Sequence, residues 1–315
     1  MTLQSTDDGR LRHLLTLEGL PRPALVGLLD RAQAFIDHDG GADPRTALAG
    51  TAVCTLFFEP STRTRLSFQR AAQRLGADVL GFDASTSSTN KGETALDTLR
   101  NIEAMGVRGF VVRHRDDGAA AMLAAFARPG TAIVNAGDGR SAHPTQGLLD
   151  VLTLRQAKGA DFSRLKVAIV GDIRHSRVAR SELHALHALG IGEVRACGPA
   201  GLLPDEGDAM LAGCSVTSDL DAALDCVDAV FMLRLQRERL LEGLVPSLEH
   251  YHRDYGLTST RLRGAARDAV VLHPGPMNRG VEISDDVADG PQSLVLTQVA
   301  NGVAVRMAVL ETLLA

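Results

Sequence analysis

The sequence is poor in aromatic residues and has no tryptophan. Aromatic side chains make up 3% of the 315 residues and only two are tyrosines, whereas hydrophobic residues make up 45%. We therefore expect cores built from alanine, leucine, valine and isoleucine, in a chain with enough of these residues for sizeable cores. A chain of this length is expected to form about two domains.

Other absences narrow the class of protein. The formal net charge is −5, so no basic face for nucleic acid is indicated. No apolar run approaches the length of a membrane span, and the first ten residues lack the apolar segment of a signal peptide. The four cysteines show no C-x-x-C spacing and are interpreted as reduced thiols. These features predict a cytoplasmic protein whose partners include neither nucleic acid nor a membrane.

Short apolar runs alternate with helical patterns along the chain. Strands are predicted at 52–58, 109–113, 131–135, 166–171, 193–197, 228–233 and 269–273. This alternation favours βαβ units, and hence an α/β protein whose sheets are mainly parallel and flanked by helices. Two stretches, 84–92 and 235–256, interrupt this alternation of strand and helix patterns. Each is either a plain surface loop or a functional one.

A predicted helix begins where hydroxyl and cationic side chains gather. Residues 61–65, S-T-R-T-R, follow the strand predicted at 52–58, and apolar residues then recur with helical spacing as far as Gly76. Ser61 or Thr62 is therefore predicted to be the N-cap. The free N–H groups of a helix start suit an anion such as phosphate, especially beside arginines. For this motif taken alone, the alternative is an ordinary serine cap with solvated arginines.

Cationic, histidine or amide side chains follow almost every predicted strand. The set is Arg113, His143, Gln146, Arg174, Arg177, Arg234, Gln236 and His273. Ligands of parallel sheets lie beyond the carboxyl ends of the strands, so we expect these residues to share one edge. Arginine captures carboxylate or phosphate through paired hydrogen bonds. The pattern predicts a small substrate with several negative charges, although any one such residue alone is more often an ordinary surface group.

Two other chemistries are disfavoured by the sequence. The segment V-A-I-V-G-D-I-R-H-S-R, residues 167–177, is similar to a dinucleotide-binding turn but lacks G-x-G-x-x-G, which argues against a nicotinamide dehydrogenase. His143 and the H-S-R segment have no Cys or carboxylate partner at metal-ligand spacing. No metal and no organic cofactor is expected.

Several ordered motifs together resemble the aspartate and ornithine carbamoyltransferase family. They are S-T-R-T-R, K-G-E, V-R-H, H-P-T-Q, H-S-R-V-A-R-S and H-P-G-P-M-N-R-G-V-E-I, and they span nearly the whole chain. The H-P-G-P segment and the residues after it are similar to the aspartate branch. The His-Cys-Leu-Pro and S-M-G stretches of the ornithine branch are absent. The resemblance implies transfer of a carbamoyl group from carbamoyl phosphate to L-aspartate, a step of pyrimidine biosynthesis.

The resemblance also implies a division of the chain. Residues 1–143, with a returning C-terminal helix at about 299–315, would form a domain that binds carbamoyl phosphate. Residues 144–298 would bind aspartate. The helical stripe of Val299, Val303, Leu310 and Leu314 is expected to pack on the first domain.

Site residues are carried over from the family one by one. Ser61, Thr62, Arg63, Thr64 and Arg113 would hold the phosphate, and Arg63, Thr64 and His143 would contact the carbonyl oxygen. Gln146 and the backbone near Gly275 and Pro276 would hold the carbamoyl amide. Arg177 would bind the α-carboxylate of aspartate, and Arg234, helped by Gln236, its side-chain carboxylate. Ser87 and Lys91 resemble loop residues that complete the site of a neighbouring subunit in a homotrimer.

The implied reaction is acyl transfer without a covalent enzyme intermediate. Arg63, Thr64, His143 and Lys91 are the expected catalytic residues, the first three as donors to the negative charge that develops on the carbonyl oxygen. Either His143 or the departing phosphate could accept the proton. The chain departs from relatives at Gly275, where some carry leucine, and at Glu182, where an amide is common. No consequence of Glu182 is read from sequence.

Two alternative functions remain open from sequence, as do the assembly and its regulation. The chain could be an ornithine or related carbamoyltransferase, or a non-catalytic homologue that only binds partners. The presence of five residues argues against a non-catalytic homologue, because a pure binding protein does not need all of them: Arg63, Lys91, His143, Arg177 and Arg234. Trimers could also join regulatory chains, dihydroorotase-like chains or no other chain, and nucleotides could regulate activity.

Overall fold

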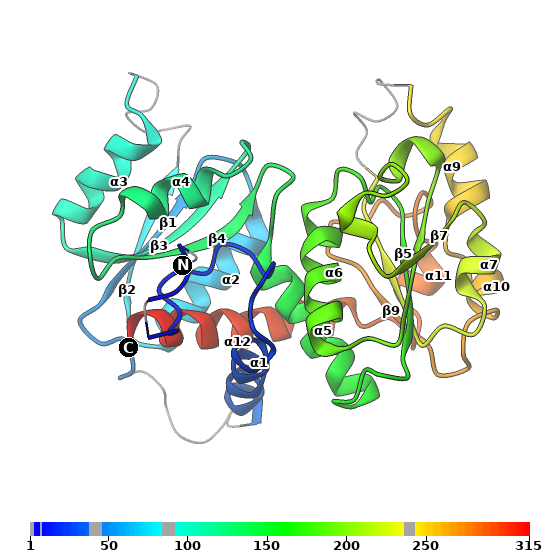
Figure 1. The fold of residues 1–315 in the computed structure, drawn as a ribbon, viewed down its shortest axis with the longest axis horizontal. Coiled ribbons are helices and arrows are strands. Elements are labelled where there is room, and N and C mark those ends of the chain that lie inside the picture. The colour runs from blue at the N-terminus through cyan, green and yellow to red at the C-terminus, as the bar shows by residue number, and fades with distance from the viewer. Residues whose placement is uncertain (1–2, 7, 38–45, 84–91, 236–242) are drawn as a thin grey trace. The chain divides into compact units, whose positions relative to one another are not determined.

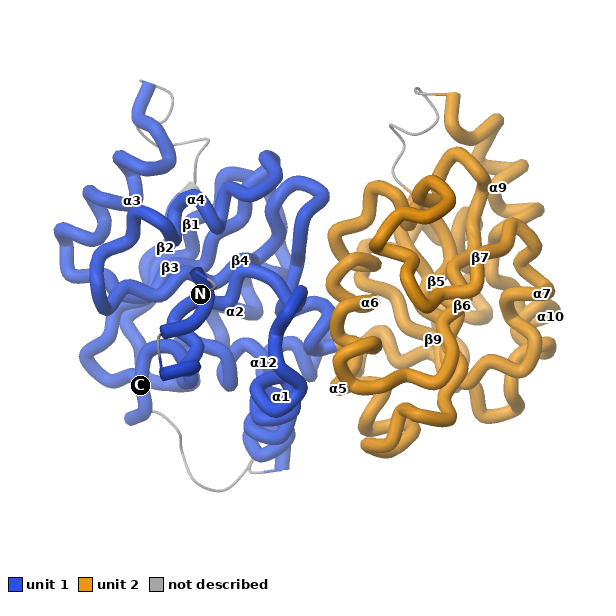
Figure 2. The backbone as a smooth tube through the Cα atoms, in the orientation of Figure 1, with its two compact units in different colours: residues 1–149, 299–315 blue, residues 150–298 orange. Residues whose placement is uncertain are grey.

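The chain divides into two compact units. A computed structural model describes residues 3–6, 8–37, 46–83, 92–235 and 243–315. Unit 1 comprises Met1–Leu149 and Val299–Ala315, and unit 2 comprises Asp150–Gln298 (Figure 2). Each unit is a parallel sheet flanked by helices, which confirms the predicted fold class.

Unit 1 is built on a sheet with the strand order β2-β1-β3-β4. Its elements are α1 (Arg22–Asp37), β1 (Ala52–Phe57), α2 (Thr62–Arg74), β2 (Asp78–Asp83), α3 (Ala95–Ala104), β3 (Val107–His114), α4 (Ala119–Phe126) and β4 (Ala132–Asp138). All neighbouring strands are parallel. The chain winds outward from β1 to β2 and then in the opposite direction to β3 and β4. The winding therefore reverses between β1 and β3, the kind of point where open α/β sheets bind ligands.

Side chains of the unit 1 strands alternate between two helical layers. Cys54 and Phe110 face a buried cluster that includes Leu99 of α3 and Leu123 of α4. Figure 1 shows α3 and α4 on one face of this sheet and α2 with the C-terminal helix on the other. The burial of both faces explains why the central strands are almost continuously apolar.

The C-terminal helix α12 (Val295–Leu314) returns to unit 1, as predicted. Its Arg306 guanidinium lies 4.9 Å from the centroid of the Phe68 ring. A Cβ on Gly109 of β3 would lie 2.7 Å from Leu314 Cδ1, so a glycine allows this close approach. The predicted apolar stripe is wrong at its start, because 47% of Val299 is exposed whereas Leu310 is fully buried.

Unit 2 repeats this architecture with the strand order β7-β6-β5-β8-β9. Its elements are α5 (Pro144–Lys158), β5 (Lys166–Val170), α6 (Arg177–Leu189), β6 (Glu193–Cys197), the 3₁₀ turns η3 (Ala200–Leu202) and η4 (Ala209–Leu211), β7 (Cys214–Thr217), α7 (Leu220–Leu224), β8 (Ala229–Met232), α9 (Leu248–Tyr255), α10 (Ser259–Leu262), β9 (Val270–Leu272) and α11 (Asp285–Ala288). Helices α5 and α12 each contribute residues to both units. The winding reverses between β5 and β8, which gives unit 2 its own switch point.

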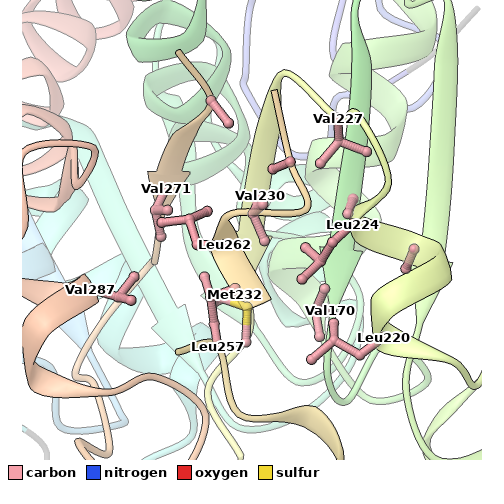
Figure 3. Close-up of a cluster of buried hydrophobic side chains, with 14 of the residues drawn as sticks. Val170, Leu220, Leu224, Val227, Val230, Met232, Leu257, Leu262, Val271 and Val287 are labelled. Atoms are coloured by element: carbon pink, nitrogen blue, oxygen red, sulfur yellow. The ribbon is translucent and has the colours of Figure 1, made fainter. Parts of the chain in front are cut away.

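One buried cluster joins the unit 2 strands to the helices on one face of the sheet. Val170 of β5, Met232 of β8 and Val271 of β9 meet Leu224 of α7 and Leu262 of α10 there (Figure 3). Aliphatic side chains dominate this cluster, and the partly buried Tyr255 packs against it. Strands β5, β8 and β9 are thereby held side by side.

The apolar runs of the sequence predict every strand except β2 and β7, the edge strands that begin the two sheet orders. β2 reads D-V-L-G-F-D and β7 reads C-S-V-T, so neither is an uninterrupted apolar run. Edge strands are commonly short and partly polar, which weakens their sequence signal. The stretch 235–256 is also not wholly a loop, because it contains α9. None of the described helices combines the length and the apolar composition needed to cross a membrane.

Candidate active site

The S-T-R-T-R segment forms the start of α2 in unit 1. Ser61 is the N-cap in extended backbone, and its side chain makes no capping bond to the helix amides. Thr62 and Arg63 are exposed and Thr64 is buried. The first-turn amides and the exposed side chains therefore surround a positively polarised helix end, as the sequence predicts.

The two arginines of this segment differ in their surroundings. Arg65 packs over the Phe57 ring of β1, with its guanidinium carbon 5.3 Å from the ring centroid. Arg63 is exposed at the first turn, and its carbonyl accepts a hydrogen bond from Ser67 Oγ at 2.7 Å. The structure thus assigns Arg65 to packing, and Arg63 is the arginine at the helix tip.

Arg113 is the last residue but one of β3, the strand that lies between β1 and β4. Its Nη2 donates to Glu59 Oε1 at 2.9 Å, and its Nη1 donates to the Ala136 carbonyl at 3.1 Å. Its own carbonyl accepts from the Phe58 amide at 2.9 Å. The side chain is only 11% exposed, so its position is well defined. Arg113 therefore lies beside the segment that leads from β1 into α2.

A buried pair of side chains that no sequence pattern predicts shapes the loop after β4. Asn135 Nδ2 donates to Asp138 Oδ1 at 2.8 Å, and the same Asp138 oxygen accepts from the Ala142 amide at 3.2 Å. His143 follows directly, and its carbonyl accepts from the Gln146 amide in the first turn of α5 at 2.9 Å. His143 and Gln146 are both buried. Asn135 and Asp138 thus set where α5 begins.

The residues predicted to bind carbamoyl phosphate lie at the ends of three adjacent parallel strands, β1, β3 and β4. The S-T-R-T-R turn follows β1, Arg113 is the last residue but one of β3, and His143 follows β4. Because parallel strands end at the same edge, these groups belong to one edge of unit 1. The edge includes the switch point between β1 and β3.

In unit 2, a short turn carries the chain from β5 into α6. Asp172 Oδ1 bonds to His175 Nδ1 at 2.7 Å, and Ser176 Oγ caps α6 by accepting from the Ala179 amide at 3.0 Å. The serine cap leaves Arg177 as the first residue of the helix. Arg177 is half-buried at this helix start.

Two other arginines, Arg174 and Arg234, also follow unit 2 strands. Arg174 donates from Nε to the Leu203 carbonyl at 2.8 Å and from Nη2 to Asp205 at 2.5 Å, which gives it a structural role. Arg234 is exposed between buried Leu233 and Leu235, two residues after β8 ends. Arg177 therefore follows β5 and Arg234 follows β8, the two strands that flank the unit 2 switch point.

The HPGP loop, residues 273–276, follows β9 and is fixed by buried hydrogen bonds. The His273 amide donates to Gln298 Oε1 at 2.9 Å, and His273 Nδ1 accepts from the Gly275 amide at 2.7 Å. His273 Nε2 then faces Glu282 Oε1 at 3.1 Å and donates to it. Gly275 has a φ of 61°, in the left-handed region that favours glycine.

The M-N-R-G-V-E-I segment ties this loop to the residue after Arg234. Glu282 is fully buried and accepts from the Asn278 amide at 2.6 Å. Asn278 Nδ2 donates to the Leu235 carbonyl at 2.8 Å. This polar chain therefore links the ends of β8 and β9, a role that spacing along the sequence does not reveal.

Three predicted site residues, Ser87, Lys91 and Gln236, lie outside the described residues. Within the described ranges, no group of three or more His, Cys, Asp or Glu side chains is arranged to hold a metal ion.

Two family models match nearly the whole chain. Residues 12–156 match the carbamoyl-P binding domain of aspartate/ornithine carbamoyltransferase, and residues 163–313 match the Asp/Orn binding domain.

Relatives and solved structures agree with this match. The chain is 74% identical over 314 residues to the aspartate carbamoyltransferase catalytic subunit of Xanthomonas axonopodis pv. citri, covering 99% of each chain. It is 73% identical over 317 residues to the same subunit of Stenotrophomonas maltophilia, covering 100% of both. Among solved structures, aspartate transcarbamoylase from Trypanosoma cruzi, in complex with carbamoyl aspartate and phosphate, is similar with a TM-score of 0.86. That match has 29% identity and covers 99% of this chain and 98% of the other. Ornithine carbamoyltransferase from Thermus thermophilus gives a TM-score of 0.84 at 29% identity, covering 96% of this chain and 99% of the other.

Proposed function

The chain belongs to the aspartate/ornithine carbamoyltransferase family, and we propose that it is an aspartate carbamoyltransferase. It transfers the carbamoyl group of carbamoyl phosphate to the amine of L-aspartate, giving N-carbamoyl-L-aspartate and phosphate. The identity of 74% to a relative with that name, over 99% of both chains, favours the aspartate branch over the ornithine branch. The product is an intermediate of pyrimidine biosynthesis.

The observation that carries the proposal is the pair of switch points. In unit 1 the strands at this point lead into an anion-binding type of helix start and Arg113. In unit 2 they lead to Arg177 and Arg234. One phosphate and two carboxylates are the charges that carbamoyl phosphate and aspartate bring, and arginine is suited to both kinds of group.

We assign carbamoyl phosphate to the unit 1 edge. Ser61, Thr62, Arg63 and Thr64 hold the phosphate with the first-turn amides of α2, and Arg113 adds its charge beside them. Arg63, Thr64 and His143 donate to the carbonyl oxygen, and Gln146 holds the carbamoyl amide. Each oxyanion donor of this kind accounts for about 10²–10³ in rate.

We assign aspartate to the unit 2 edge, where Arg177 holds the α-carboxylate and Arg234 with Gln236 holds the side-chain carboxylate. The backbone at Gly275 and Pro276 also accepts from the carbamoyl amide. This fits the bond from the Gly275 amide to His273, which leaves carbonyl oxygens as the groups the loop can offer. The amine attacks the carbamoyl carbon and a tetrahedral intermediate forms. Phosphate then leaves with the electrons of the broken C–O bond, and the proton that the amine loses passes to this phosphate, directly or through His143.

A substrate comparison tests the function. The purified chain is given carbamoyl phosphate with either aspartate or ornithine, and phosphate release and the carbamoylated amino acid are measured. We expect carbamoyl aspartate and no citrulline. Formation of citrulline would place the chain in the ornithine branch. If no phosphate is released with either amino acid, a binding protein without this activity would be favoured.

We also propose that the chain works as a homotrimer in which Ser87 and Lys91 complete the site of the next subunit. The support is the family resemblance of the 84–92 segment. Each site then needs Arg63 from one chain and Lys91 from its neighbour, across a head-to-tail interface that closes into a ring. The cytoplasmic location and any association with regulatory or dihydroorotase-like chains stay predictions.

Mixed trimers test this sharing. Arg63→Ala and Lys91→Gln trimers should each be nearly inactive. After equal amounts are dissociated and reassembled, about three quarters of trimers are mixed, and each mixed trimer has one intact site. Activity should therefore rise toward roughly a quarter of the wild-type value. If native mass spectrometry confirms mixed trimers and activity stays near zero, the sites are not shared.

A further inference from the structure

Two carboxyl groups face each other in the interior of unit 2. Glu182 lies on α6 and Asp150 on α5, and their exposed fractions are 1% and 0%. Their side chains lie within hydrogen-bonding reach of each other. Neither oxygen of Glu182 receives a hydrogen bond from an amide, hydroxyl or cationic donor of the described residues. Because an ionised carboxylate only accepts, a hydrogen bond between the two groups forms only when one of them carries a proton.

The surroundings show which group holds the proton. Asp150 Oδ1 accepts a hydrogen bond from Gln298 Nε2 at 2.6 Å, the kind of contact that suits a carboxylate. Glu182 has no such donor. Burial first, and then the negative charge of Asp150, raise the pKa of Glu182 well above its ordinary value. The proton therefore belongs on Glu182 and the negative charge on Asp150.

The pair is the first member of a continuous polar chain. Gln298 receives at Oε1 the hydrogen bond of the His273 amide, and His273 receives that of the Gly275 amide. Beyond them stands the buried pair of His273 Nε2 and Glu282. The Gln298 side chain is fixed at both ends, by Asp150 and by His273. Its orientation, and with it that of the HPGP loop, depends on Asp150 remaining a well-placed acceptor.

We propose that Glu182 keeps its proton and donates it to the Asp150 carboxylate, and that this bond positions the HPGP loop. Glu182 is then a positioning residue, since it acts through Asp150, Gln298 and His273. The same bond joins α6, whose first residue is Arg177, to α5. The effect on catalysis rests on the proposed function, whereas the shared proton does not.

The shared proton predicts a particular dependence of stability on pH. The unfolded chain loses the Glu182 proton near the ordinary value of 4.5, whereas the folded chain keeps it to higher pH. The folded state therefore binds more protons above that value, and its stability falls as pH rises toward the raised pKa. Glu182→Gln keeps a donor but has no proton to lose. Its stability should exceed that of the wild type by an amount that grows with pH, by up to about tenfold in the unfolding constant per pH unit.

Urea unfolding of the full chain from about pH 5 to about pH 8 measures this difference. The matched control is Glu206→Gln, the same change at an exposed position of unit 2, which should follow the wild type at every pH. Asp150→Asn removes the opposing charge and should reduce the slope. A difference between wild type and Glu182→Gln that does not change with pH would overturn the shared proton.

Activity tests the positioning role separately. Glu182→Leu removes the donor, and we expect kcat/KM for carbamoyl phosphate to fall about tenfold, the scale of one buried hydrogen bond. Glu182→Gln should restore it to within about twofold, because its amide still donates to Asp150. Equal losses in both variants would overturn the positioning role. If Glu182→Leu does not fold, the isosteric Glu182→Gln variant and the urea series still decide. If the wild type does not carbamoylate aspartate, the proposed function fails while the urea series still tests the proton.

Discussion

The two units share one topology but support their functional edges in different ways. In unit 1, the edge is built mostly from backbone and from the helix starts at Ser61 and His143. The buried polar contact that supports it is the hydrogen bond from Asn135 to Asp138. In unit 2, a deeper chain of buried acids, amides and a histidine, from Glu182 to Glu282, lies behind the edge.

The arginines at the two edges also differ in how they are supported. Arg113 in unit 1 is paired with Glu59 at the edge itself. Arg234 in unit 2 is exposed, and Asn278 binds the carbonyl of the next residue, Leu235. A phosphate is held well by many N–H and hydroxyl donors. Two carboxylates at the fixed spacing of aspartate instead need two cations in fixed places. The contrast suggests that each unit is adapted to the geometry of its own anion.

The largest effect is expected from the helix tip of unit 1. Arg63→Ala removes a donor to both phosphate and carbonyl oxygen, so kcat should fall about 10³-fold. Arg65→Ala is the matched control, because Arg65 packs over Phe57 and should affect stability by about 0.5–1 kcal/mol with little loss of turnover. Steady-state rates on folded protein, verified by circular dichroism, measure both. Similar turnover losses in the two variants would show that the structure does not separate their roles.

An intermediate effect, confined to one substrate, is expected in unit 2. Arg234→Ala loses a charge-assisted bond to the aspartate side chain, which raises KM for aspartate about ten- to hundredfold. Carbamoyl phosphate affinity should stay near the wild-type value. Arg174→Ala is the control, since that guanidinium is already bonded to Leu203 and Asp205. Loss of carbamoyl phosphate binding with aspartate use intact would reverse the assignment of the two edges.

Local sequence signals predicted the parts of the site that begin elements. Proline suits the first helical position, so the sequence predicts that a helix begins at Pro144 with His143 at its tip, and α5 does begin there. The order of motifs after the central strands also matches β1, β3, β4, β5, β8 and β9. These features depend on residues close together in the chain, where spacing and propensity carry the signal.

The supporting polar chains could not be predicted in this way. Asp150 and Gln298 are 148 residues apart, and neither lies in a pattern that marks it as a partner of the other. Asn278 and Glu282 were visible only as part of a family motif, while their bonds to Leu235 and His273 are set by how β8 and β9 pair. The distinction between Arg63 and Arg65 likewise required the position of the Phe57 ring.

The smallest effect is expected on phosphate binding, when the charge at the unit 1 edge is changed. Glu59→Gln keeps an oxygen that can accept from Arg113 but removes the negative charge, so the unit 1 edge becomes more positive. Inorganic phosphate should bind about two- to threefold more tightly at low ionic strength, because this partly exposed pair contributes only a modest Coulomb energy.

Salt should abolish this gain, since screening weakens exposed charges most. The matched variant in unit 2 is Asp205→Asn, which removes the carboxylate partner of Arg174 and should leave phosphate binding unchanged. Calorimetric titration with phosphate at low and high salt measures both variants. If Glu59→Gln weakens phosphate binding, Glu59 serves chiefly to hold Arg113 in place. Unit 1 would then, like unit 2, depend on a carboxylate behind its cation, and the contrast between the two edges would narrow to how deeply that carboxylate is buried.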